Sequence, residues 1–187
     1  MPRNITLNLV LETAAKLVEE NGLENLNLNI LAKELGIKPP SLYNHINGIA
    51  ELQQGLSLLV LERVADAVQR SAVGRSEENA LREVSLSYRR FAGEHPELYK
   101  LFVHSPGLSG KRALESVAEI LRRILSVYNL SESDETNFIR IFHSAMHGFV
   151  SLENADFFSA QADVADSYNK LIDSQIFILN NMRGKAR

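Results

Sequence analysis

The stretch that decides the fold is residues 26–52, LNLNILAKELGIKPPSLYNHINGIAEL. Its apolar residues recur at helical spacing on both sides of Gly36, and two prolines follow that glycine closely. This order indicates a short helix, a tight turn, a second short helix that closes on residues 43–45, and the start of a third. Two short helices joined in this way are typical of the helix-turn-helix motif, which reads double-stranded DNA.

The residues at their ends predict where the two short helices begin and stop. Asn27 has a side-chain oxygen that can cap the first helix, and Gly36 suits the left-handed residue that ends it. Pro39 and Pro40 cannot continue a helix but suit a first turn, so the second helix should begin there. The apolar residues between these signals should face the core: Leu28, Leu31, Ala32, Leu35, Ile37, Leu42 and Ile46.

The residues left on the other faces are candidates for DNA contact. Most carry short or planar hydrogen-bonding groups, the kind that meet base edges and phosphates in protein–DNA complexes. The candidates are Asn27, Lys38, Pro40, Ser41, Tyr43, Asn44 and His45. The pattern alone leaves an alternative open, because many all-helical proteins contain two short amphipathic helices with a glycine between them.

A wider match favours the DNA-reading interpretation. The block from Thr6 to Leu52 resembles the TetR family of transcriptional repressors, and its matching positions include Gly22, Leu23, Asn27, Leu31, Ala32, Gly36, Ile37, Ser41, Leu42, Tyr43, His45 and Leu52. The chain has Ile49 where the family commonly has a lysine that touches a phosphate, and Lys38 where the family often has a capping Ser or Thr. The resemblance implies a homodimer that binds DNA and a C-terminal domain that binds a small-molecule effector.

The charge distribution excludes a protein that coats DNA without regard to sequence. Residues 1–50 hold four basic and five acidic side chains, a net charge of −1, and the whole chain is −3. A non-specific DNA-binding protein would be strongly basic. From residue 35 to residue 50 the only fixed charge is Lys38, so no acid there opposes phosphate. We therefore expect useful affinity for DNA to require two DNA-binding domains acting together.

Composition bounds the remaining classes. The chain has 187 residues, 45% of them hydrophobic, and no cysteine, so disulfides and thiolate metal sites are excluded. No apolar run approaches the roughly 18 residues of a membrane span. The N-terminus lacks the apolar core of a signal peptide. We expect a cytoplasmic protein with no membrane association and no cofactor.

Beyond residue 48 the apolar spacing is helical throughout, and no segment alternates as a strand does. Helices are expected over residues 49–70, 77–93, 96–102, 114–128, 132–153 and 163–182. Ser76 and the pair Ser131 and Asp134 are predicted N-terminal caps. The predicted fold is all-α with about nine helices. Residues 1–48 are predicted to form the DNA-binding domain, and residues 49–187 the effector-binding and dimerisation domain.

The predicted helix over residues 132–153 is apolar over too wide an arc for one core face. Gly148 lies inside it, where glycine costs about 1 kcal/mol relative to alanine, and close approach of another helix would explain it. His147 and Gly148 resemble a motif of one TetR subgroup, and in the family the last two long helices pair across the dimer. The expected interface comprises Gly148, Ser151, Leu152, Leu171, Gln175 and Ile178. The alternative is an ordinary buried core helix.

His143 and His147 share a helix face, but no third metal ligand is identifiable and Arg140 on the same stripe would repel a cation. No metal site is therefore predicted. Few charged residues occupy interior positions, so an apolar or weakly polar effector is expected. The candidate pocket residues are Tyr88, Phe91, Phe102, Phe138, Phe142 and His147, with ordinary core packing as the alternative for each.

Two other functions compete with a ligand-responsive repressor. A small helical enzyme would use His143, His147 and Glu153 as acid–base groups, but no nucleophile motif or phosphate-binding loop accompanies them. A helical ligand-binding or interaction module without DNA binding would fit the acidic first helix and Ile49. The favoured interpretation is a homodimeric, non-enzymatic regulator that binds a palindromic operator and is released by a small apolar effector.

Overall fold

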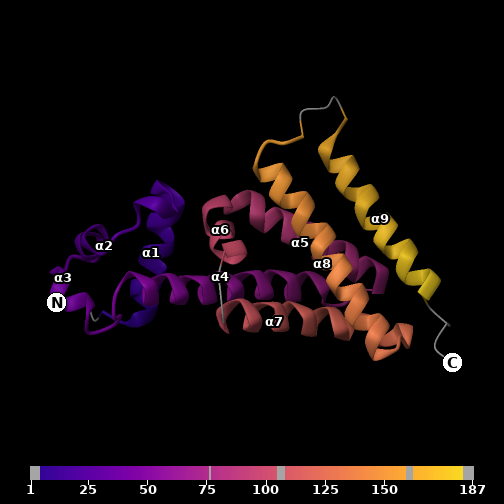
Figure 1. Cartoon of the computed structure of the whole chain (residues 1–187), viewed down its shortest axis with the longest axis horizontal. Helices are drawn as coiled ribbons and strands as arrows, with labels where there is room; N and C mark the ends of the chain where they lie inside the picture. The colour runs from indigo at the N-terminus through magenta and orange to yellow at the C-terminus, as the bar shows by residue number, and fades with distance from the viewer. Residues whose placement is uncertain (1–4, 76, 105–107, 159–161, 183–187) are drawn as a thin grey trace. The chain divides into compact units, whose positions relative to one another are not determined.

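The computed structural model describes residues 5–75, 77–104, 108–158 and 162–182, and leaves out the side chains of residues 102–104, 108–114 and 116. Within these ranges the chain forms nine α-helices and two 3₁₀ helices, and no strand (Figure 1). The predicted all-α fold with about nine helices is confirmed. The helices are α1 (Leu7–Asn21), η1 (Leu23–Asn25), α2 (Leu28–Leu35), α3 (Pro39–Leu42), α4 (Ile49–Ala72), α5 (Glu77–Glu94), α6 (Pro96–His104), α7 (Leu108–Leu125), η2 (Ser126–Tyr128), α8 (Glu132–Asn154) and α9 (Val164–Met182).

Side-chain caps begin the helices where the sequence predicts them. The Asn27 side chain accepts a hydrogen bond from the Ile30 N–H at 3.0 Å, and the Ser131 hydroxyl accepts one from the Asp134 N–H at 3.1 Å. Gly36 ends α2 in the left-handed region, with φ 71° and ψ 27°. The predicted cap at Ser76 lies outside the described residues. These caps satisfy backbone groups that a helix end would otherwise leave unpaired.

The second helix of the motif is shorter than predicted. It ends at Leu42, and residues 43–45 form a turn rather than its last part. Pro39 and Pro40 open α3 without N–H groups of their own. The N–H groups of Asn44 and His45 then reach back only three residues, to the carbonyls of Ser41 and Leu42 at 3.4 and 2.8 Å. The segment is therefore wound more tightly than an α-helix over its second half.

The chain divides into two compact units that do not follow the predicted boundary at residues 48 and 49. Unit 1 comprises Met1–Arg63 and His95–Ala113, and unit 2 comprises Val64–Glu94 and Leu114–Arg187. In unit 1, α1 packs against α2 and α6, and α2 packs against α3. The first part of α4 and all of α6 thus belong with the predicted DNA-binding head.

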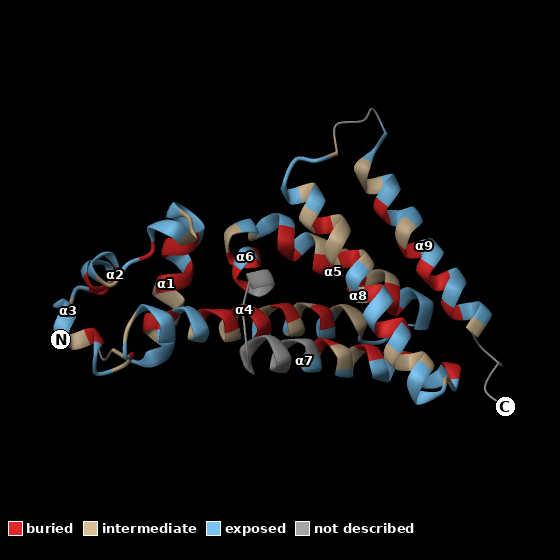
Figure 2. Cartoon of the chain, viewed as in Figure 1, coloured by how far each residue is buried: buried red, intermediate tan, exposed pale blue. Residues whose placement is uncertain are grey.

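Unit 2 is built around α5, α8 and α9, which pack on one another. Figure 2 shows buried residues along one side of α9 and exposed residues along the other. The centre of the unit includes Phe138, Phe142, Val150, Tyr168 and Ile172, each at most 2% exposed. The Tyr168 hydroxyl, buried among apolar groups, donates a hydrogen bond to the Ser85 carbonyl at 2.8 Å. In the described part of the chain, none of the helices has the length and apolar composition that crossing a membrane requires.

Candidate nucleic-acid interface and regulatory sites

The turn that follows α3 presents most of the predicted DNA-contacting side chains to solvent. Leu42 and Ile46, 0% and 2% exposed, anchor the segment to the core of unit 1. The Tyr43 ring between them is 58% exposed. Lys38, Pro40 and Asn44 are also exposed, and Ser41 and His45 are half-buried. The structure therefore brings six of the seven predicted residues together on one short segment.

Asn27, the seventh predicted residue, is exposed but is already engaged by its own backbone. Its Oδ1 atom caps α2, and its Nδ2 atom donates to the Asn25 carbonyl at 3.3 Å. The N-terminus of α4 is also ordered by a side chain, because the Glu51 carboxylate accepts a hydrogen bond from the Asn47 N–H at 2.6 Å. Glu51 is the only acidic residue between residues 35 and 52, and this hydrogen bond turns its carboxylate toward the backbone.

Helix α6 is bound to the end of α1 by polar contacts that sequence patterns do not show. A Glu97 carboxylate oxygen accepts a hydrogen bond from the Leu23 N–H at 3.3 Å. The Lys100 ammonium beside it lies 2.5 Å from the other oxygen. Lys100 is the main cause of the lowered Glu97 pKa, and the Leu23 N–H adds to it against the opposing effect of burial. His95, which directly precedes α6, has its Nδ1 atom 2.5 Å from Glu19 Oε1 of α1. The Glu97 and His95 contacts together join the start of α6 to the C-terminal end of α1.

The two predicted histidines belong to a polar cluster between α5 and α8. His147 Nδ1 lies 3.2 Å from the Tyr88 hydroxyl, and its Nε2 lies 3.4 Å from the Ser151 hydroxyl. The rings of His143 and His147 stack with centroids 6.0 Å apart. Burial lowers the pKa of His143, and the neighbouring His147 lowers it further. Among the described residues, no group of three or more potential metal ligands occurs.

Glu153, the third residue of the enzymatic alternative, is held in an ion pair. The Arg89 guanidinium donates to both of its carboxylate oxygens, at 2.8 and 2.5 Å. The same guanidinium lies 5.1 Å from the centroid of the Tyr168 ring, a cation–π geometry. Hydrogen bonding to Glu153 is the main cause of the raised Arg89 pKa. This bidentate pair links α5, α8 and α9 in unit 2.

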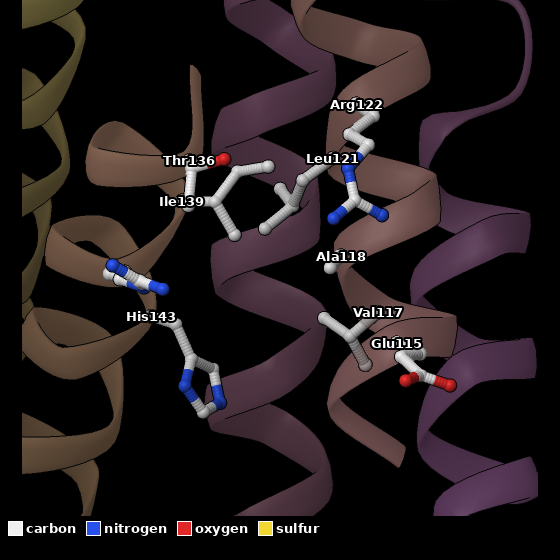
Figure 3. A pocket seen from close by; sticks show the side chains of 9 residues that line it. Glu115, Val117, Ala118, Leu121, Arg122, Thr136, Ile139 and His143 are labelled. Atoms are coloured by element: carbon white, nitrogen blue, oxygen red, sulfur yellow. The ribbon is translucent and has the colours of Figure 1, made fainter. Parts of the chain in front are cut away.

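A pocket of about 270 Å³ opens between α7 and α8 (Figure 3). Its lining residues are Glu115, Val117, Ala118, Leu121, Arg122, Thr136, Ile139, Arg140 and His143. Val117, Leu121 and Ile139 are buried and form its apolar wall. Sequence reasoning did not select this set, although the residues lie at helical spacing on two adjacent predicted helices.

None of the six residues predicted to line an effector pocket belongs to this one. Tyr88, Phe91, Phe138 and Phe142 are 1–8% exposed and pack in the core of unit 2, and His147 belongs to the polar cluster. The side chain of Phe102 lies outside the described residues. The physical reason is volume, because large rings fill the space between helices, whereas Ala118 and Val117 leave some free.

The predicted dimer residues on unit 2 fall into three groups by exposure. Leu152 and Ile178 are 43% and 40% exposed, whereas Gly148, Ser151 and Leu171 are half-buried. Gln175 is buried inside the unit, so its side chain is not on an exposed face. Two further apolar residues of α8 and α9 that the prediction did not include are also exposed, Ile141 at 52% and Phe177 at 69%. Their sequence signal was available, since both lie off the core-facing stripe of their helices.

Comparison with known proteins gives one consistent result. The family model described as the tetracyclin repressor-like C-terminal domain matches residues 81–175. An HTH-type transcriptional regulator of Mycobacterium tuberculosis is 31% identical over 157 residues, covering 81% of this chain and 72% of that protein. The HTH-type transcriptional regulator YobS of Bacillus subtilis is 26% identical, covering 87% of this chain and 86% of that protein.

The fold also matches a solved structure over nearly its full length. A TetR variant from Acinetobacter baumannii, in complex with minocycline, has a TM-score of 0.75 over 97% of this chain and 100% of that one. The sequence identity is 20%, so this likeness concerns the fold alone.

Proposed function

Because this chain belongs to the TetR family of transcriptional regulators, we propose that it is a repressor that binds a palindromic operator as a homodimer and is released by a small-molecule effector. The observation that carries the proposal is the exposed Tyr43 turn, set on a buried anchor of Leu42 and Ile46. Membership of the subgroup with a His-Gly motif at His147 and Gly148 stays a prediction.

DNA reading is supported by the chemistry of the exposed turn. The Tyr43 hydroxyl and ring, the Asn44 amide and the Lys38 ammonium are accessible together. An amide can read a base edge, and a hydroxyl or ammonium can bind phosphate. A single DNA-binding domain offers few cations to phosphate. Two such domains about 34–36 Å apart, one turn of DNA, would bind two half-sites together and so reach a higher affinity.

Homodimer formation is supported by apolar side chains that no described residue covers. Ile141 and Leu152 on α8, with Phe177 and Ile178 on α9, are 40–69% exposed. A Cβ atom on Gly148 would meet nothing within 4 Å in the described chain, so a closely approaching helix there must come from outside it. Exposed apolar groups on adjacent helices typically mark an interface.

Effector control is supported by the pocket between α7 and α8, which a small molecule can enter. A ligand changes DNA affinity only if it binds one state of the dimer more tightly than the other. We propose that the effector favours a dimer whose heads do not match successive major grooves.

The test is Tyr43→Ala, measured by fluorescence anisotropy on operator DNA selected from a genomic library at near-physiological salt. We expect at least a tenfold loss of affinity for the selected site. The matched control is Val73→Ala, which trims an apolar side chain 73% exposed in unit 2, and its affinity should be unchanged. Salt-labile binding with no preferred sequence in the parent protein would contradict the repressor function.

A further inference from the structure

Resting on the proposed function, we propose that the pocket between α7 and α8 binds a small monocarboxylate, an apolar body with a single carboxylate group. The cavity places cationic and hydrogen-bonding groups beside an apolar wall (Figure 3). This proposal differs from the sequence-based expectation of an apolar or weakly polar effector. The occupant is a free metabolite of this chemical class, recognised by its charge and its size.

The wall of the pocket selects an apolar body of limited length. Val117 and Leu121 on α7 and Ile139 on α8 are 2–9% exposed, and Ala118 leaves space beside them. The volume of about 270 Å³ lies near the lower end of the ~300–1,000 Å³ range of small-molecule sites. A large polycyclic ligand would not fit without displacing a helix.

The charged lining favours one negative charge. The charged residues that line the pocket are Arg122, Arg140 and Glu115, and because Arg122 is paired with Glu119 and Glu135, Arg140 is the cation that a ligand can neutralise. Figure 3 shows Arg122 at one end of the α7 wall and Glu115 toward the other. Two helical turns separate these two residues, about 10 Å along the axis. At the Arg122 end the carboxylates of Glu119 and Glu135 already pair with the guanidinium, so the ligand's carboxylate is assigned to Arg140.

Arg122 and Arg140 have different surroundings. The Arg122 guanidinium lies 3.8 Å from Glu119 and 3.6 Å from Glu135, so it already links α7 to α8. No described carboxylate lies within ion-pair distance of Arg140. A bound carboxylate would give Arg140 a bidentate partner, the geometry in which guanidinium groups bind most strongly.

The remaining polar groups complete the site. Thr136 supplies a hydroxyl, and the half-buried His143 supplies an imidazole that its surroundings hold in the neutral form. An apolar ligand would cover Arg140, Thr136 and His143 without replacing the water bound to them, which is costly. A carboxylate replaces that water with hydrogen bonds.

The test compares three ligands with the same tail: octanoate, 1-octanol and octylamine. Binding to the full-length protein is measured by titration calorimetry at pH 7.5, with thermal stabilisation as a second readout. We expect octanoate to bind at least tenfold more tightly than the alcohol, because of one added charge-assisted contact. Octylamine should bind most weakly. Equal affinity for acid and alcohol, tightest binding of the amine, or no binding of any of the three would overturn the inference.

Two variants locate the contact. Arg140→Gln should lower octanoate affinity about tenfold and leave 1-octanol affinity unchanged. The control is Arg70→Gln on α4, whose side chain is 74% exposed and away from the pocket lining, and it should retain the full preference for octanoate. If Arg140→Gln also retains that preference, the assignment is wrong.

Operator binding separates this inference from the function on which it rests. Both Arg140→Gln and the parent protein should bind the operator equally well without ligand. If octanoate fails to bind while operator binding is intact, only the carboxylate assignment falls. If the unliganded parent protein fails to bind any operator, the proposed repressor function falls.

Discussion

Asn27 shows at the scale of one residue how a side chain can set the start of the reading motif. Its carboxamide accepts from the Ile30 N–H and donates to the Asn25 carbonyl. The residue therefore defines where α2 begins, with no partner from DNA. A direct contact of Asn27 with DNA stays a prediction, and the geometry gives this residue a capping role at the start of α2.

The substitution Asn27→Ala removes this cap and should lower the free energy of unfolding of unit 1 by about 1 kcal/mol. Asn27→Ser keeps a capping oxygen and should lose at most a few tenths of that. Denaturant unfolding followed by circular dichroism measures the difference. Equal losses in both variants would show that the capping oxygen is not what stabilises α2.

His143 should make the stability of unit 2 sensitive to acid. Its pKa is lowered in the folded chain by burial and by His147, so the unfolded chain takes up a proton first as the pH falls. The contribution is complete above the ordinary histidine pKa of about 6.5 and is lost as the pH falls toward the lowered folded value.

The variant His143→Gln cannot take up that proton and should lose less stability than the parent between pH 8 and pH 5.5. Thermal melts of both proteins across this range provide the measurement. A parallel decline in the two proteins would show that His143 does not cause the loss.

At the scale of helices, the Arg89–Glu153 pair fastens α5 to α8 beneath the Tyr168 ring of α9. Arg89→Met keeps much of the side-chain volume but leaves the half-buried Glu153 without its cation. We expect a loss of about 2 kcal/mol in the free energy of unfolding, between the values for exposed and fully buried pairs. Arg90→Met, at the exposed neighbouring position on α5, is the control and should change stability by less than ~0.5 kcal/mol.

Helix boundaries could be predicted from the sequence where a local signal exists, and tertiary placement could not. Asn27, Gly36 and Ser131 mark ends through bonds to residues within a few positions. The Leu23–Glu97 hydrogen bond joins residues 74 apart in sequence, so no periodic pattern reveals that α6 packs with the head.

The candidate sites also differ in whether a local sequence signal predicts them. The exposed residues around Tyr43 were predictable because Leu42 and Ile46 fix which face is buried. The pocket was not, because it lies where Val117 and Ala118 leave space, and free volume has no sequence signature of its own. The aromatic residues chosen from the sequence are the ones that fill volume.

For the whole molecule, the proposed homodimer gives a direct test of the exposed face on α8 and α9. Phe177→Glu places a charge where an apolar ring is 69% exposed. A symmetric interface on this face would bury one such charge from each protomer, so we expect at least a tenfold weaker dimer and a parallel loss of operator affinity. Sedimentation equilibrium measures the first effect.

Val73→Glu introduces the same charge at a similarly exposed apolar residue in the turn between α4 and α5. It should leave the dimer intact. A dimer that tolerates Phe177→Glu would move the interface away from α9.

The grouping of α6 with α1 also limits how this regulator can be recombined. The chain leaves unit 1 after Arg63, returns to it at His95 and leaves it again after Ala113, so no single cut separates the two units. A chimera that fuses residues 1–48 to a foreign sensor would discard the carboxylate that Glu97 supplies to Leu23. Sensor exchange should succeed only when the donor brings a segment equivalent to residues 95–113, with its own hydrogen-bond acceptor for the Leu23 N–H at the end of α1. Transfer of the DNA-binding unit to another protein therefore requires both of its chain segments, residues 1–63 and 95–113. The choice of linker alone does not decide the outcome.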